Sequence, residues 1–395
     1  MRRTLAILVC SSLITACGAQ MQGTQPPLYR ASQSSARPLD GGTELPGDSG
    51  TALPGDSGTA LPGAQMACAP DIAAGTASCG VAININIAPI ESPNTPASMI
   101  PGLHPSDLES LYALPVQAAG ERIALVDAYD DPSAEADMSV YRAAYGLPAC
   151  TSASGCFTRV NQSGTQGAYP SANSAWSEEI SLDLDMVSAI CPNCPILLVE
   201  ANSPSIEDLG AAADTAAASG ARVVSNSYYS AEWNGETSED AHYDHAGVLM
   251  TASSGDQNYP SYPAASPDVI AVGGTSLQNG VEVPWTYSGH GCSAYEPRVR
   301  WQDGLTGCTT RSAVDVAAVA DPQTGVSIYD SLAGGWLVAG GTSVGAPIVA
   351  AAYALADNGK QAPYTYAHAA SLHRIDGAAY GTYTGLGSPD GLAAF

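Results

Sequence analysis

Positively charged residues are scarce in this sequence of 395 residues. Lys and Arg together number 13 against 38 Asp and Glu, Lys360 is the single lysine, and the formal net charge is −25. Binding to nucleic acid in general needs a cationic surface, so this balance excludes that class of function. Charged residues make up 13% of the chain, well below the roughly 25% of an average domain. Such a low charge density suits a protein that works in acid or one that is secreted.

The N-terminal residues lack an apolar run long enough to span a bilayer. They have instead the order of an export signal: Arg2 and Arg3, a short apolar run at 5–9, and small residues before a cleavage point. The sequence therefore predicts an exported protein.

The end of this signal, Ile14–Thr15–Ala16–Cys17, resembles a bacterial lipobox. The resemblance implies a signal peptide over 1–16, cleavage before Cys17 and lipidation of its thiol. Because Gly18 rather than an aspartate follows, it also implies anchoring at the outer membrane or cell surface, with release to the medium left open. The alternative is an ordinary signal peptide with an incidental cysteine.

Two segments separate the signal from the body of the chain. Residues 17–66 are rich in Gly, Pro and Ser, and they contain an eight-residue repeat, Leu45–Ala52 and Leu53–Ala60. One leucine per repeat cannot bury a core, so we expect a disordered tether. Residues 67–100 contain two cysteines and some strand-like alternation, which indicates an N-terminal arm packed on the body.

The body, 101–395, alternates apolar β-branched runs with helical patterns. We expect strands at 123–126, 196–199, 223–224, 248–251 and 269–272, and helices at 134–145, 178–190, 206–218, 241–245 and 343–356. This alternation predicts an α/β fold with a mainly parallel sheet covered by helices on both faces. Active residues are then expected at the carboxyl ends of the strands.

Cysteine is the residue that most clearly supports export. The sequence has 10 cysteines, of which Cys10 lies in the signal and Cys17 at its end. An even number remains, which in an exported chain indicates disulfides. We expect sequential pairs among Cys68, Cys79, Cys150, Cys156, Cys191, Cys194, Cys292 and Cys308. The Cys191–Cys194 spacing also allows a redox or metal pair, but no second such motif accompanies it.

A candidate nucleophile is Ser343, which directly follows Gly341 and Thr342 at the start of a predicted helix. Glycines permit a tight turn and a close approach by substrate, and a helix N-terminus favours developing negative charge. The alternative is an ordinary N-cap serine. None of the six histidines lies in a His-Gly-Thr-His setting at a helix start, as a subtilisin-type base would require.

Carboxylates offer a different base. Glu179 and Asp183 are spaced i, i+4 and share one face of a predicted helix, where two like charges are unfavourable unless they share a proton. The neighbouring Glu178 and Asp185 are expected to face solvent. Asp256 follows a predicted strand, where a neutral carboxyl can donate to an oxyanion. Alternatively, Gly255–Asp256 is a simple turn.

Together these motifs resemble the sedolisins, serine-carboxyl peptidases with a subtilisin-like fold. The match consists of Glu179-x-x-Leu182-Asp183, Gly255–Asp256 and Gly341–Thr342–Ser343 with Pro347. It covers about 100–395.

The resemblance implies an endopeptidase that hydrolyses proteins or peptides. Ser343 attacks the scissile carbonyl, Glu179 is the general base, Asp183 orients Glu179, and protonated Asp256 donates to the oxyanion. Asp127 extends the carboxylate chain. A carboxylate base and a protonated donor both favour acid, so we expect activity at acid pH. We expect the body to act as a monomer.

Two features depart from the family. Sedolisins usually bind calcium near the C-terminus, but Arg374 stands where the resemblance places an aspartate ligand, so we expect no cofactor and no family-type calcium site. Sedolisins also carry a large folded prodomain, whereas only the tether and the arm precede this body.

Three alternatives stay open. In the first, the chain is an inactive relative that binds peptides or partners through the same cleft. In the second, it is a subtilisin-type protease that uses Asp127, His290 and Ser343. In the third, it is a structural lipoprotein.

Overall fold

The computed structural model describes residues 61–69, 73–115, 118–356 and 359–395. These residues belong to one compact unit. The predicted signal peptide, Cys17 and the repeats lie outside the described residues. No helix in the described ranges is long and apolar enough to cross a membrane.

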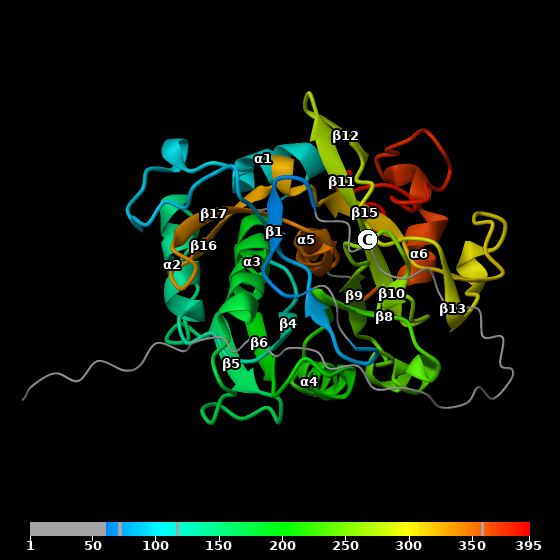
Figure 1. The fold of residues 1–395 in the computed structure, drawn as a ribbon, viewed down its shortest axis with the longest axis horizontal. Helices are drawn as coiled ribbons and strands as arrows, with labels where there is room; N and C mark the ends of the chain where they lie inside the picture. Colours follow the sequence, from blue (N-terminus) through cyan, green and yellow to red (C-terminus); the bar gives the residue numbers. More distant parts are fainter. Residues whose placement is uncertain (1–60, 70–72, 116–117, 357–358) are drawn as a thin grey trace, which may run out of the picture. The chain divides into compact units, whose positions relative to one another are not determined.

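Strands and helices alternate along most of the chain (Figure 1). The helices are α1 (Pro105–Tyr112), α2 (Ala134–Ala144), α3 (Ser174–Ile190), α4 (Ile206–Ala218), α5 (Thr342–Ala356) and α6 (Ala362–Ala367). The strands are β1 (Ala64–Met66), β2 (Ser78–Cys79), β3 (Ala82–Asn84), β4 (Ile123–Ala128), β5 (Phe157–Asn161), β6 (Ile196–Ala201), β7 (Val223–Asn226), β8 (Tyr228–Ala231), β9 (Leu249–Ser253), β10 (Ser261–Tyr262), β11 (Val269–Gln278), β12 (Val281–Pro284), β13 (Cys292–Pro297), β14 (Thr310–Ser312), β15 (Val316–Val319), β16 (Val326–Asp330) and β17 (Gly335–Gly340).

The central sheet has eight strands and is mainly parallel, as predicted. Its order is β12-β11-β9-β7-β4-β6-β5, with β15 paired to β11. All pairs are parallel except β11 with β12. Strands β4, β6, β7 and β9 are buried along their whole length, which is why they read as continuous apolar runs.

Helices α3 and α5 pack on each other beneath the middle of this sheet, where α3 contacts β4 and α5 contacts β7, β9 and β11. Helix α4 packs on β4 and β6 instead. The core therefore forms around the strands that precede the predicted functional residues. It fixes α3 and α5 against each other.

Helix α3 starts earlier than predicted and is buried on more sides. The Asn173 side chain caps it by accepting hydrogen bonds from the amides of Ala175 at 3.0 Å and Trp176 at 3.2 Å. The expectation that Asp185 faces solvent is wrong: this carboxyl is buried and accepts from the Tyr329 amide at 2.9 Å. Helix α2 and strand β16 cover that side of α3. The helix expected at 241–245 is only a 3₁₀ turn, Asp240–His242.

The N-terminal arm adds strands to the edges of the body. Strand β3 lies between β1 and β17 in a four-stranded antiparallel sheet with β16, and β2 pairs with β8. The predicted end of the tether at residue 66 is too late, because Leu61 is buried and β1 is paired. In Figure 1 this arm, drawn in blue, runs across the middle of the molecule.

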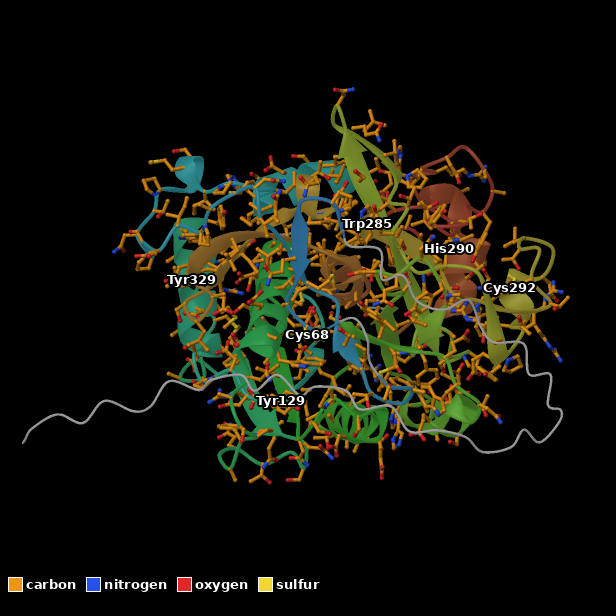
Figure 2. All side chains as sticks on the ribbon, viewed as in Figure 1. Cys68, Tyr129, Trp285, His290, Cys292 and Tyr329 are labelled. Carbon is orange, nitrogen blue, oxygen red and sulfur yellow. A yellow bond between two sulfur atoms is a disulfide. The ribbon has the colours of Figure 1, made fainter. Side chains whose placement is uncertain are left out.

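The eight remaining cysteines form four disulfides between sequence neighbours, the pairing expected from the sequence. They are Cys68–Cys79, Cys150–Cys156, Cys191–Cys194 and Cys292–Cys308. Figure 2 shows Cys68 on the arm near the centre of the view and Cys292 at the β13 side. Because Cys191 and Cys194 are bonded to each other and buried, they are a structural pair rather than a metal site.

Candidate active site

Ser343 is held at the start of α5 by a tight turn after β17. Gly341 has a φ of +100°, and a Cβ there would lie 1.8 Å from the carbonyl oxygen of Gly80. Only glycine fits this turn without displacing its neighbours. The Ser343 side chain is buried, and its Oγ donates to the carbonyl oxygen of Ser227 at 3.1 Å. A buried hydroxyl at a helix N-terminus is well placed to stabilise charge that develops beside it.

Glu179 and Asp183 lie one turn apart on α3, and both are fully buried. Neither oxygen of either carboxyl has a hydrogen-bond partner of normal geometry. Burial raises the pKa of Glu179 well above its usual range, the Asp127 carboxyl raises it further, and the nearby Ser343 hydroxyl lowers it. Burial, Asp127 and Glu179 likewise raise the pKa of Asp183. Burial and the repulsion between like charges therefore favour a proton shared between these carboxyls.

Asp256 joins the loop after β9 to the turn before α5. Its Oδ1 accepts from the Thr342 amide at 2.8 Å and the Thr342 hydroxyl at 2.9 Å, while Oδ2 has no partner. Burial raises the pKa of Asp256 to about 7, against the lowering effect of the two Thr342 bonds. Because Oδ1 accepts both Thr342 bonds, Oδ2 is the oxygen left to carry a proton when this acid is neutral.

Asp127, near the end of β4, completes a cluster of four buried acids. Its two oxygens have no hydrogen-bond partner, and burial raises its pKa to about 8. Its charge raises the pKa of both Glu179 and Asp183. The structure therefore places Asp127 in the same buried cluster as Glu179, Asp183 and Asp256.

The amino-acid sequence identifies the protein family. A model of the subtilase family matches residues 159–374, more than half of the chain. The chain belongs to the subtilase family. The matched range contains Glu179, Asp183, Asp256 and Ser343, and it makes this protein one of a family of serine peptidases. A search of curated proteins finds no match.

The structure of one solved peptidase shows the same fold, and a second solved structure is a weaker match. Pseudomonas sedolisin, a serine-carboxyl proteinase solved with two molecules of pseudo-iodotyrostatin, superposes with a TM-score of 0.62 and 22% identity, covering 74% of this chain and 96% of that one. Fervidolysin from Fervidobacterium pennivorans, a keratinolytic enzyme related to subtilisin, has a TM-score of 0.49 and 17% identity, covering 72% of this chain and 43% of that one. The subtilisin-like α/β fold predicted for the body is confirmed.

In the described part of this subtilase, no hydrogen bond joins a histidine to Ser343, whose Oγ donates to the Ser227 carbonyl oxygen. Nδ1 of His290 lies 3.1 Å from the Ser288 carbonyl oxygen, and its ring faces Tyr383 with centroids 4.1 Å apart. Figure 2 shows His290 toward the β13 side, near Cys292. The alternative triad of Asp127, His290 and Ser343 is therefore not assembled.

We propose that the C-terminal loop of this subtilase holds no family-type calcium ion. Arg374 brings a cation to the position where the sedolisin resemblance places a ligand. The carbonyl oxygens of Gly381 and Gly385 each accept the other residue's amide, at 2.9 and 2.7 Å, and Asp376 Oδ1 accepts from the Ala378 amide at 3.0 Å. In the described ranges no group of three or more His, Cys, Asp or Glu side chains is placed to hold a metal.

Chelation is therefore expected to leave stability unchanged. The melting temperature measured in EDTA should lie within about 1 °C of that in excess calcium. A ligand raises stability when it binds the folded state and not the unfolded state, and we expect no calcium ion to bind the folded state here. Magnesium serves as the control cation. A drop of several degrees in EDTA that calcium but not magnesium restores contradicts this prediction.

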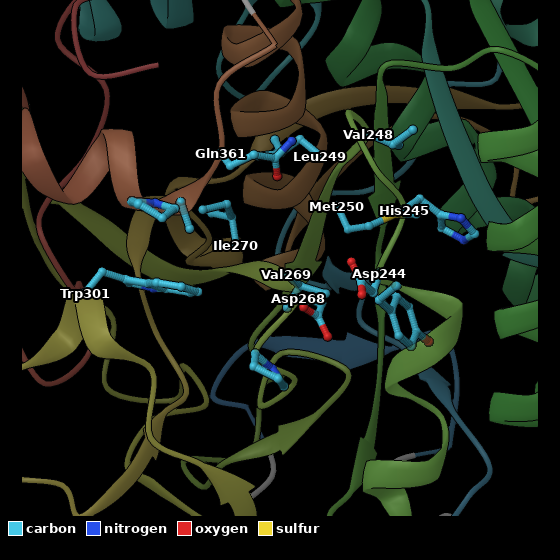
Figure 3. A pocket seen from close by; sticks show the side chains of 14 residues that line it. Asp244, His245, Val248, Leu249, Met250, Asp268, Val269, Ile270, Trp301 and Gln361 are labelled. Atoms are coloured by element: carbon cyan, nitrogen blue, oxygen red, sulfur yellow. The ribbon is translucent and has the colours of Figure 1, made fainter.

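A separate open pocket of about 100 Å³ lies at the other end of the sheet (Figure 3). Leu249 and Val269, the first residues of β9 and β11, line it together with Trp301. Asp256 follows the opposite, carboxyl end of β9. The pocket is therefore remote from the clustered acids and is not part of this site.

Sequence reasoning missed one contact of the site, the arm residue Gly80. A Cβ at Gly80 would lie 2.4 Å from Ser343 Oγ. A single glycine in a loop carries no local signal of such a contact, because it arises from residues more than 260 positions apart.

Proposed function

We propose that this subtilase is a serine-carboxyl endopeptidase of the sedolisin type that cleaves proteins or peptides in acid. The observation that carries the proposal is the convergence of buried acids from two elements on one serine from a third. Glu179 and Asp183 come from α3, Asp256 from the loop after β9, and Ser343 from α5.

In the proposed mechanism, Ser343 Oγ leaves the Ser227 carbonyl, gives its proton to Glu179 and attacks the substrate carbonyl carbon. Glu179 then passes the proton to the leaving amine. Asp183, next to Glu179 on the same helix face, orients it and shares its proton. Such groups often align fully only when substrate is bound.

Asp256 is the proposed oxyanion donor. Thr342 bonds its Oδ1, Oδ2 has no partner, and burial raises the pKa of this carboxyl to about 7, so that Oδ2 carries the proton in acid. A donor already oriented toward developing charge costs no reorganisation during the reaction. Above its pKa, the same atom becomes an anion and repels the oxyanion.

The loss of activity at alkaline pH, which is the alkaline limb of the pH profile, is therefore expected to follow the deprotonation of Asp256. With the wild type, kcat/KM on denatured protein should fall tenfold per pH unit as the pH rises through about 7, because the donor loses its proton. The Asp256→Asn variant keeps a neutral donor that does not titrate. It should lose about 10²-fold in rate at pH 5, as measured for single oxyanion donors, and also lose this limb.

Asp268→Asn is the matched control for this profile. Burial raises the pKa of Asp268 to about 6, but the residue lines the pocket at the far end of the sheet. Its replacement should leave the alkaline limb in place. A limb near pH 7 that survives in Asp256→Asn would show that another group controls it.

The exported, lipid-anchored location stays a prediction from the sequence. Four disulfides suit an oxidising compartment.

A further inference from the structure

An open groove of about 240 Å³ lies between the N-terminal arm and the start of α3. Its walls are mostly apolar, and Met66, Ile83 and Leu337 are among the larger side chains that form them. None of the residues of the candidate active site lines this groove. It is therefore a feature separate from the reacting groups.

A single ionisable side chain lines the groove, that of Glu178. Its carboxyl is half-buried, and within the described ranges no hydrogen bond or ion pair joins it to another residue. The fully buried Asp330, whose Oδ2 accepts from the Ser177 hydroxyl at 2.8 Å, is the acid near it. Burial and the Asp330 charge raise the pKa of Glu178 to about 7. The ionised form of Glu178 therefore lacks the cation that would stabilise it.

Strand β1 presents an open edge along this groove. It is the last strand in the order β1-β3-β17-β16, and among the described strands it pairs with β3 alone. Successive side chains of a strand point to opposite faces, yet Gln65, Met66 and the next residue, Ala67, all line the groove. The groove therefore reaches the edge of β1 and does not lie under one face. Open strand edges pair with extended peptides, whose alternate side chains enter pockets beside the edge.

Two exposed apolar side chains flank the groove. Ile85, which lines it, is 60% exposed, and Leu332, next to the lining residue Ala333, is 52% exposed. Large apolar side chains that gather beside one groove are typical of surfaces that a partner covers. They offer apolar contacts to a peptide that lies along the edge of β1.

We propose that this groove binds an extended basic peptide of a partner protein, which pairs with the edge of β1 and places one lysine side chain beside Glu178. The apolar stem of lysine suits the walls of the groove, and its ammonium group supplies the charge that Glu178 lacks. A lone carboxylate does not suit a divalent metal ion, which needs several oxygen ligands. The inference is independent of the proposed peptidase function.

The occupant comes from another protein. The single lysine of this chain, Lys360, lies 3.4 Å from the centroid of the Tyr364 ring and is held there. The formal net charge of −25 attracts cationic partners to the body and repels acidic ones.

Binding is expected to strengthen as the pH rises from 5 to 7. The ammonium group attracts only the ionised carboxyl, so below the pKa of Glu178, about 7, the peptide must displace a proton. The dissociation constant should then fall about tenfold per pH unit and level off above pH 8. Asp330, at the end of β16, is the other acid that acts on Glu178, and the arm and β17 contribute no titratable side chain to the lining.

The test uses the full-length Ser343→Ala variant, so that the probe cannot be cut. The probe is the peptide Val-Thr-Val-Lys-Val-Thr-Val with blocked ends and a fluorescent label, and its twin has norleucine in place of lysine. Fluorescence anisotropy at pH 7.5 and low salt should show the lysine peptide binding at least about tenfold more tightly than its twin, the usual effect of a hydrogen bond to a charged group. Hydrogen exchange should show added protection of amides 64–67 when the lysine peptide is bound.

Adding Glu178→Gln should weaken binding of the lysine peptide to the level of the norleucine peptide and remove the pH dependence. Glu207→Gln is the matched control, because it changes an exposed acid at the start of another helix, α4. Equal binding of the two peptides, or an equal loss of both in Glu178→Gln, would overturn the proposal. Unchanged exchange of amides 64–67 in the complex would overturn the pairing with β1. Whether the wild-type chain cuts peptides affects none of these outcomes.

Discussion

Replacing Ser343 with alanine is expected to lower kcat/KM by at least about 10⁴-fold, the usual cost of removing a serine nucleophile. The fold should not change, because the lost Oγ makes a single hydrogen bond, to the Ser227 carbonyl, and alanine is smaller than serine. Glu179→Gln should lose a comparable factor. The amide has the shape of the acid but cannot take the proton of the nucleophile.

Initial rates on denatured protein at pH 3–6 measure both losses. Asp185→Asn is the matched control for Glu179→Gln. It removes another buried acid from α3, but one that faces Tyr329 rather than the serine. Near-normal activity in Glu179→Gln, together with a large loss in His290→Ala, would restore the subtilisin-type alternative and sink the carboxyl mechanism.

Stability is expected to rise as the pH falls from 8 to 5, by about 3 kcal/mol or more in unfolding free energy. Burial raises the pKa of Asp127 to about 8, of Glu200 to about 9 and of Asp256 to about 7. In the unfolded chain such carboxyls titrate near pH 4, so between pH 4 and these values the folded state binds more protons. Its stability is therefore greatest in acid and is lost as the pH rises through the folded pKa values.

The size of this effect follows from linkage. A carboxyl whose pKa rises from about 4 to about 7 couples folding to pH over three units, each worth about 1.4 kcal/mol. Nearby positive charge offsets little of this rise in pKa. Near Glu200 the Arg159 guanidinium lies 3.7 Å away and opposes the rise. We expect the melting temperature at pH 5 to exceed that at pH 8 by roughly 5 °C or more.

Calorimetry at one fixed scan rate across pH 4–9 tests this expectation. Glu200→Gln removes one of the raised groups and should flatten the dependence, whereas Glu207→Gln changes an exposed acid at the start of α4 and should not. A melting temperature that peaks at pH 7–8 would mean that the clustered acids are ionised in the folded protein.

Local sequence was sufficient for most of the framework. Continuous β-branched runs predicted the buried strands β4, β6, β7, β9 and β11, because a strand covered on both faces needs apolar side chains at every position. The i, i+4 spacing put Glu179 and Asp183 on one face of α3. Gly341 before a helical pattern marked the turn that presents Ser343. Each inference depends on residues within a few positions of one another.

The remaining features depend on residues far apart in the chain. The segments that pack on α3 determine whether an acid on this helix faces solvent or the core. Asp185 is buried because β16, whose Tyr329 is 144 residues later in the chain, packs there and donates the Tyr329 amide. The proton on Asp256 depends on Thr342, 86 residues later. The arm lies on Ser343 through pairing with β8 and β17. Spacing could place the acids and the serine along the chain. Their common burial and the contact of the arm with Ser343 follow instead from packing and long-range strand pairing, which no local pattern encodes.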